Sequence, residues 1–376
     1  MVRSRLTGVP FVIALAFAAW LRPLPAAAIP QFSVQTGLQC DACHESVRAT
    51  TGLGDYYVES NYRFPNLGIH GAPVVAVRGR AVYTSDGSDE HLPKTTVDAL
   101  EAFLAARVSP EVSVAAEAYA VDGGTPGALR EAWVQYMTPR RIGAAPARLT
   151  IGLQSLPLPV DPEAFRQTTT PYAIFEQQVD DSPFSLVQPK NAVQFGVGSP
   201  VRGVSVAAML ADGHDPGSGL PGHGIDRMIE AQYAAGGAVI GGYIYNGARD
   251  LDGIEDGFRR AAVFANAYRG RFALETLAQR GTDVDPLHGV VASSGGFVQL
   301  RYQFTSGDFA LARYDRANDQ TGSDERSLVL GFSHALGRSL RLGAEDRIHA
   351  RPTRGHELRA SLGFGFSNTR FGSGAY

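Results

Sequence analysis

The residues after Pro73 alternate apolar and polar side chains in repeated segments, and this alternation constrains the fold more than any other feature. In the segment 297–304, for example, Gln299, Arg301 and Gln303 alternate with apolar residues. Successive side chains of a β-strand point to opposite faces. Strict alternation therefore predicts strands with one wet face and one apolar face.

Sixteen segments of this kind follow one another, each of about the ten residues that a tilted membrane strand needs. No stretch after the N-terminal leader is long and apolar enough for a membrane helix. The predicted strands lie near residues 73–84, 96–108, 111–121, 128–138, 147–155, 191–199, 201–210, 225–235, 237–246, 258–268, 271–281, 295–305, 308–316, 324–335, 338–350 and 353–366.

The connections between these segments alternate in length. Short ones are built on Ser109-Pro110, Pro200, Gly236, Gly270, Ser306-Gly307 and Gly337, and long ones cover 85–95, 122–127, 156–190, 211–224, 247–257, 282–294 and 317–323. Bacterial barrels alternate short periplasmic turns with long extracellular loops in this way. We therefore predict an all-β fold, a transmembrane antiparallel β-barrel of about 16 strands over residues 73–376, with both termini periplasmic. The alternative is a soluble two-sheet protein or a propeller, which would have shorter strands and less regular connections.

The first 28 residues have the pattern of a secretory signal peptide. Arg3 and Arg5 provide the positive region, an apolar run covers 9–21, and Ala26-Ala27-Ala28 is a small-residue cleavage site. We expect the mature chain to begin at Ile29. Basic residues (34) nearly balance acidic ones (37), and the net charge of −3 argues against a nucleic-acid partner.

The motif Cys40-Asp41-Ala42-Cys43-His44 contains both cysteines of the chain. This Cys-x-x-Cys-His spacing suits two thioether bonds to one haem, with His44 as the proximal iron ligand. The competing interpretations are a disulfide, a zinc site and a thioredoxin-like pair. Zinc would need further ligands and thioredoxin a βαβ unit, and neither is visible, while a disulfide leaves His44 unexplained.

The sixth iron ligand stays open in the sequence. His70 is the nearest downstream histidine and our first candidate, so the predicted metal ligands are His44 and His70. His349 falls on the predicted lumen face and is a second candidate, and five-coordinate iron is a third possibility. Residues 29–72 are too few to bury a haem alone. We expect this monohaem cytochrome c segment to plug the lumen, with lumen side chains as walls. The arginines of the predicted lumen face, which would pair with acids or with the haem propionates, are Arg78, Arg80, Arg301, Arg341, Arg347 and Arg359.

The run from Ile29 to His44 resembles the fused outer-membrane cytochrome–porin family of iron-oxidising bacteria, which shows Pro-x-Phe followed by Thr-Gly-x-x-Cys-x-x-Cys-His. A second similarity covers Leu156-Pro157-Leu158-Pro159, Pro162-Glu163, Arg166 and Tyr172. The resemblance implies a monohaem porin that carries electrons inward from extracellular donors, classically ferrous iron. It also implies that Cys40 and Cys43 attach the haem and that His44 is an axial ligand.

Three functional hypotheses follow. The first is electron transfer across the outer membrane through one covalent haem c, from extracellular Fe(II) to a periplasmic carrier, or outward to extracellular acceptors. The second is a porin for small solutes with a structural or sensory haem. The third is a haem enzyme acting on a small molecule such as peroxide. Acidic residues of the predicted loops, Asp283 among them, offer oxygen ligands to ferrous iron, but ordinary solvated loops carry such residues too.

Overall fold

The computed structural model describes most of the chain from Val74 onward. The predicted signal peptide, 1–28, and the predicted haem segment, 29–72, lie outside it. The described residues are 74–86, 93–109, 111–138, 145–160, 162, 166–179, 184–213, 224–251, 254–285, 289–305, 308–336, 340–351 and 355–367.

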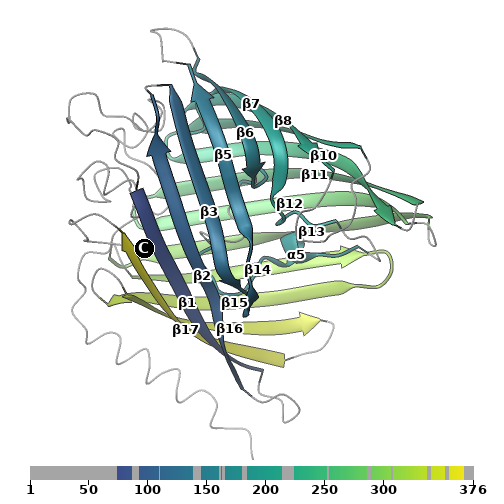
Figure 1. Ribbon diagram of the computed structural model, residues 1–376. Coiled ribbons are helices and arrows are strands. Elements are labelled where there is room, and N and C mark those ends of the chain that lie inside the picture. The colour runs from purple at the N-terminus through teal and green to yellow at the C-terminus, as the bar shows by residue number, and fades with distance from the viewer. Residues whose placement is uncertain are drawn as a thin grey trace, which may run out of the picture.

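Sixteen long antiparallel strands form a closed barrel (Figure 1), and a two-residue strand, β4 (Thr125–Pro126), pairs with β3. The barrel closes because β1 pairs with β17 as well as with β2. The predicted fold class and the sixteen strands are thus confirmed. The long strands are β1 Val74–Ser85, β2 Lys94–Arg107, β3 Val112–Asp122, β5 Leu129–Met137, β6 Ala147–Gln154, β7 Lys190–Gly198, β8 Gly203–Asp212, β9 Ile225–Ala235, β10 Ala238–Leu251, β11 Ile254–Arg269, β12 Phe272–Asp285, β13 Gly289–Gln303, β14 Phe309–Asp319, β15 Asp324–Leu336, β16 Leu340–Arg351 and β17 Gly355–Ser367.

The two faces of the wall differ as the alternation predicts. On β13, Val298 is 50% exposed on the outside and Gln299 is 1% exposed on the inside. The outer face carries valine, leucine, isoleucine and aromatic side chains around the barrel. An apolar outer wall suits lipid, which offers no hydrogen bonds to polar groups. Among the described residues, no helix has the length and apolar character needed to cross a membrane.

Both ends of the barrel chain lie at one rim, where the short turns also lie. β1 begins beside the end of β17, because Ala76 pairs with Ser367. The hairpin between β9 and β10 turns at this rim through Gly236 and Gly237, with φ of 57° and 78°. Two successive positive φ values give a turn whose twist matches that of the strands, and glycine adopts them without steric cost. We call this the short-turn rim.

Two segments predicted as long loops are mostly strand, so these two predictions are wrong. The segment 247–257 is mostly strand, since β10 and β11 pair as far as Leu251 and Ile254. The segment 282–294 is also mostly strand, with Asp285 paired to Gly289. Their polar residues continue the hydrogen-bonded ladder above the apolar part of the wall, where hydropathy no longer reveals a strand.

A band of aromatic rings lies on the outside near the short-turn rim. Phe272 and Tyr302 have ring centroids 4.9 Å apart, Tyr302 and Phe304 lie 5.0 Å apart, and Phe304 and Phe332 lie 6.3 Å apart. Phe272 follows the turn at Gly270, so the band marks this edge of the apolar wall. Aromatic girdles of this kind flank the apolar band of membrane barrels at both interfaces.

Candidate functional site in the barrel lumen

The longest connection, between β6 and β7, folds into the barrel. Predicted as an extracellular loop over 156–190, it instead contacts inward-facing residues of the opposite wall. Its one helical turn, α5 (Ala173–Glu176), packs against β13 and β14, as Figure 1 shows. We call residues 155–189 the lumen loop. Loops longer than about 15 residues are uncommon in compact proteins and are usually functional.

A polar anchor holds the middle of the lumen loop. Arg313 of β14 donates to Thr168 Oγ1 at 2.7 Å, to the Thr170 carbonyl at 3.0 Å and to the Pro171 carbonyl at 2.7 Å. Glu345 of β16 accepts the backbone N–H groups of Thr169 and Thr170. Charge-assisted bonds of this kind are about twice as strong as neutral ones. The loop is therefore fixed to the wall by wall charges that bind its backbone.

The lumen loop is also held by its own side chains. Arg166 donates to the carbonyls of Pro162, Thr168 and Thr169 at 2.8–2.9 Å, which closes the loop on itself. Tyr172 is 2% exposed and packs under the Arg313 guanidinium, which lies 4.2 Å from its ring centroid. Arg166 and Tyr172 belong to the segment noted for its family resemblance, and both shape this loop.

Apolar packing fills the lumen beneath the loop. Tyr172 lies 4.5 Å from Phe297 of β13, and Phe184 stacks on Phe258 of β11 at 3.8 Å between centroids. These rings belong to one buried cluster whose loop members are Leu156, Val160, Tyr172, Ile174, Phe175, Phe184, Leu186 and Val187. Burying one such side chain contributes about 1.5–3 kcal/mol, so the apolar cluster and the polar anchor both favour the docked loop.

Buried ion pairs line the same side of the barrel. Arg249 of β10 binds Asp226 of β9 at 2.9 Å, and both side chains are fully buried. Arg260 of β11 binds Asp283 of β12 at 2.8 Å. Asp283 therefore lies inside the barrel in an ion pair, and its predicted place in a solvated extracellular loop is wrong. The four side chains of these two ion pairs are at most 4% exposed.

Charged side chains on the other side of the lumen are partly exposed in the described part of the chain. Arg78 and Arg80 of β1, 21% and 23% exposed, pair with Glu101 and Asp98 of β2. Neighbouring strands continue this wall, where Arg347 pairs with Glu325, Arg359 pairs with Glu357, and His349 lies 3.7 Å from Glu357. We call this surface of β15–β17, β1 and β2 the charged wall. His349 faces the lumen, as predicted.

The predicted haem residues Cys40, Cys43, His44 and His70 all lie outside the described residues. Within the described ranges, no group of three or more histidine, cysteine, aspartate or glutamate side chains is arranged to hold a metal ion. The lumen arginines considered as partners of a haem mostly bind carboxylates of the wall.

Comparison with known proteins identifies the fold. No protein-family model and no curated protein matches the sequence. Among solved structures, an anion-selective porin from Comamonas acidovorans gives a TM-score of 0.59 at 10% identity, covering 79% of this chain and 99% of that one. The loop-deletion mutant of OmpT, an outer membrane protein of Vibrio cholerae, gives 0.56 at 13% identity, with 79% and 99% covered. Salmonella typhi OmpF, in complex with daunomycin, gives 0.54 at 10% identity, with 79% and 97% covered. The chain thus has the porin fold.

The sequence did not reveal the anchor of the lumen loop. Arg313 falls on the inward face of a predicted strand and Glu345 on that of another, but nothing local couples them to the backbone of Thr168–Thr170. The available signal was the composition of the loop. Its leucine, valine, isoleucine and phenylalanine residues suit a buried segment better than a solvated extracellular one.

Proposed function

We propose that this protein is a porin-type channel of the Gram-negative outer membrane, with its short-turn rim and both termini in the periplasm. The apolar outer wall, the aromatic band and the porin fold support this proposal. Short turns lie on the periplasmic side of bacterial barrels. The periplasmic rim would then be the one where β1 begins, which suits a chain that enters the membrane from that side.

The observation that carries the proposal is the unequal filling of the lumen. Side chains on the side of β9–β14 are buried against the lumen loop. The loop reaches the charged wall only through Glu345 and Arg359 among the described residues, and Arg78, Arg80 and Arg347 of that wall stay partly exposed. The pore would run along the charged wall. Arginines pair with carboxylates there, so the route suits small polar or charged solutes. Apolar solutes gain no favourable contacts from such a charged and hydrated wall.

Single-channel recording of the full-length protein in planar bilayers tests this function. We expect discrete conductance steps, with a reversal potential in a salt gradient that shifts toward cations in the Arg78→Gln/Arg80→Gln variant. That variant removes two positive charges from the pore wall and leaves the lumen loop untouched. A protein that inserts into bilayers without conductance steps contradicts the channel proposal.

The motif at Cys40–His44 supports a second candidate, electron transfer across the outer membrane. Cys40 and Cys43 would attach one haem c, His44 would be its axial ligand, and His70 is the candidate sixth ligand. The haem would supply a one-electron carrier. As the resemblance implies, electrons would pass from extracellular Fe(II) to a periplasmic carrier. The alternative direction is electron export to extracellular acceptors. Residues 29–72 precede β1 directly, so they would reach the lumen beside the charged wall.

An optical experiment separates the two candidates. Ferrous iron is added outside intact cells that produce the protein, and the absorption of reduced c-type haem is followed. Sharpened bands that disappear in a His44→Ala control support electron transfer. An unchanged spectrum, with haem still reducible by a strong permeant reductant, removes iron as the donor and leaves the channel candidate with a structural or sensory haem. A Cys40→Ala/Cys43→Ala variant should lose all covalent haem, as measured by a haem stain after denaturing electrophoresis.

A further inference from the structure

The outer wall of the barrel carries a row of four arginines. Arg227, Arg259, Arg280 and Arg316 stand at outward positions of β9, β11, β12 and β14. Within the described part of the chain, none of the four forms an ion pair. Another outward arginine, Arg326 of β15, binds Asp324 at 3.0 Å. Unbalanced charge on a lipid-facing wall is costly unless a counter-charge lies at the same depth.

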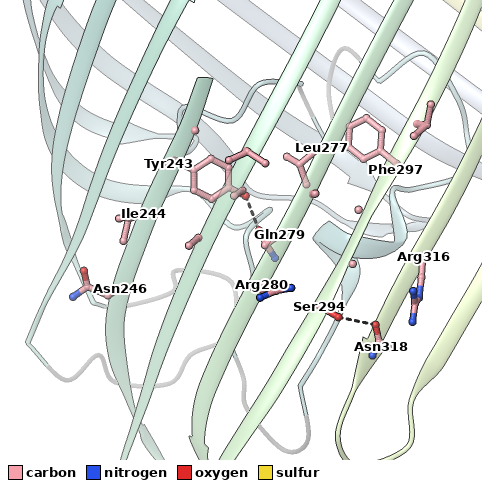
Figure 2. Close-up of a pocket in the computed structure, with 18 of the residues that line it drawn as sticks. Tyr243, Ile244, Asn246, Leu277, Gln279, Arg280, Ser294, Phe297, Arg316 and Asn318 are labelled. Atoms are coloured by element: carbon pink, nitrogen blue, oxygen red, sulfur yellow. Dashed lines mark hydrogen bonds between the residues drawn. The ribbon is translucent and has the colours of Figure 1, made fainter. Parts of the chain in front are cut away.

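The strand register places these side chains side by side. Arg227 pairs across to Asn246, and Asn246 pairs across to Arg259. Arg280 pairs with Ser294 and Ser294 with Asn318, while Arg316 lies two residues from Asn318 on the same strand. Strands lie about 4.8 Å apart and residues about 3.4 Å apart along a strand, so the Cα atoms of successive arginines in the row are separated by about 8–12 Å. Figure 2 shows Arg280 and Arg316 on either side of the Ser294–Asn318 hydrogen bond of 2.9 Å.

A groove of about 1110 Å³ lies on the outer wall below this row. Arg227, Arg280 and Arg316 line this groove, and so do outward residues with small side chains, among them Gly242, Ala261 and Gly296. Exposed apolar side chains also line it, with Ile229 59%, Val263 66% and Val298 50% exposed. An acyl chain would bury apolar surface in this groove while the arginines bind an anionic group at its end.

The depth of the row fits the edge of a lipid leaflet. Along β12, Arg280 stands eight residues beyond Phe272 of the aromatic band. At about 3.4 Å per residue and a tilt of about 40°, this separation spans roughly 21 Å along the membrane normal. The apolar band of such barrels is about 25 Å tall. The row therefore lies near the headgroup level of the leaflet opposite the short-turn rim.

We propose that this row and groove form a binding site for a phosphorylated glycolipid of the outer leaflet, the lipid A part of lipopolysaccharide. Arg280 and Arg316 bind phosphate, because the guanidinium group matches phosphate with two parallel hydrogen bonds. Ser294 and Asn318 offer neutral polar contacts between them. The groove holds an acyl chain. This inference rests on the proposed membrane orientation, which places the row at the outer leaflet.

Native mass spectrometry of the full-length protein in detergent micelles, titrated with bisphosphorylated lipid A, tests the site. The Arg280→Gln/Arg316→Gln variant should bind lipid A at least about tenfold more weakly than the unaltered protein. The matched control is Arg269→Gln/Arg271→Gln. It removes the same charge at the short-turn rim, where β11 and β12 meet, and should bind normally. Dephosphorylated lipid A should bind weakly to all three proteins.

Several outcomes would overturn the proposal. Equal binding by both variants would show that the row does not recognise phosphate. Phosphatidylglycerol bound as tightly as lipid A would point to the inner leaflet. Loss of a dimer or trimer, rather than of lipid, from the Arg280→Gln/Arg316→Gln variant would make the groove an interface with a second copy. Conductance of the same preparations is recorded separately, so that a failed channel is told apart from a failed lipid site.

Discussion

Release of the lumen loop is the change that should alter the channel most. Arg313 makes three hydrogen bonds to the loop and one, at 2.7 Å, to Asp315. Each charge-assisted bond is worth about 1.5–3 kcal/mol, so Arg313→Met removes about 4 kcal/mol or more of docking energy. A loss of 4 kcal/mol lowers the ratio of docked to undocked loop roughly a thousandfold.

The assay is single-channel conductance in planar bilayers. We expect the double variant Arg313→Met/Asp315→Asn to conduct at least about twofold more than the unaltered protein, because the middle of the loop loses its polar anchor and leaves a wider aqueous lumen while the apolar cluster keeps the rest docked. The second substitution prevents a buried, unpaired carboxylate from masking the effect through misfolding. The control is Arg347→Met, which removes a lumen arginine that binds Glu325 and Ser327 of the wall.

The Arg347→Met control removes one charge from the pore wall and no hydrogen bond to the described residues of the lumen loop. It should change ion selectivity without widening the pore. Size exclusion is measured with neutral polymers of increasing size. A polymer too large for the pore of the unaltered protein should enter the pore of the double variant and not that of the control. Equal conductance and equal size exclusion in the double variant and the unaltered protein would refute the reasoning, because the loop would then be held without its anchor.

Two further predictions concern stability, measured as urea unfolding in detergent micelles by tryptophan fluorescence. Asp226→Asn should cost about 3–5 kcal/mol, since it leaves the fully buried Arg249 without its carboxylate, and adding Arg249→Met should recover most of the loss. Gly152→Ala should cost about 1–3 kcal/mol, because φ is +135° there and a Cβ atom would come within 2.2 Å of the Ala132 carbonyl oxygen. Gly355→Ala, where a Cβ would meet nothing within 4 Å, should be neutral.

Strand prediction succeeded where membrane and water impose alternation, and failed where they do not. The sixteen segments were located because many strands have an apolar outward residue at every second position, as Val298 and Leu300 show on β13, and because short and long connections alternate between them. The same logic placed His349 and the charged wall on the lumen side. It failed at 247–257 and 282–294, because strands that extend beyond the apolar band have polar residues on both faces.

The candidate site was only partly predictable. Lumen arginines such as Arg78 and Arg347 were found because they alternate with apolar residues, but their partners were not assigned. Asp283 was misplaced in a loop for the reason given above. The lipid-facing arginine row also escaped the sequence, since an isolated outward arginine, such as Arg280, is indistinguishable from a rim residue until neighbouring strands are aligned.

The sequence alone determined that this chain is a sixteen-stranded barrel, which face of each strand meets lipid, and that Cys40-Asp41-Ala42-Cys43-His44 precedes the barrel. These properties are local, since they follow from period-two alternation and from short motifs. Only the tertiary structure decided how the lumen is divided. The lumen loop turns inward because Arg313 and Glu345, some 145 and 175 residues away from their partners, meet its backbone inside the closed barrel. Contacts at that separation depend on barrel closure, which no local pattern encodes.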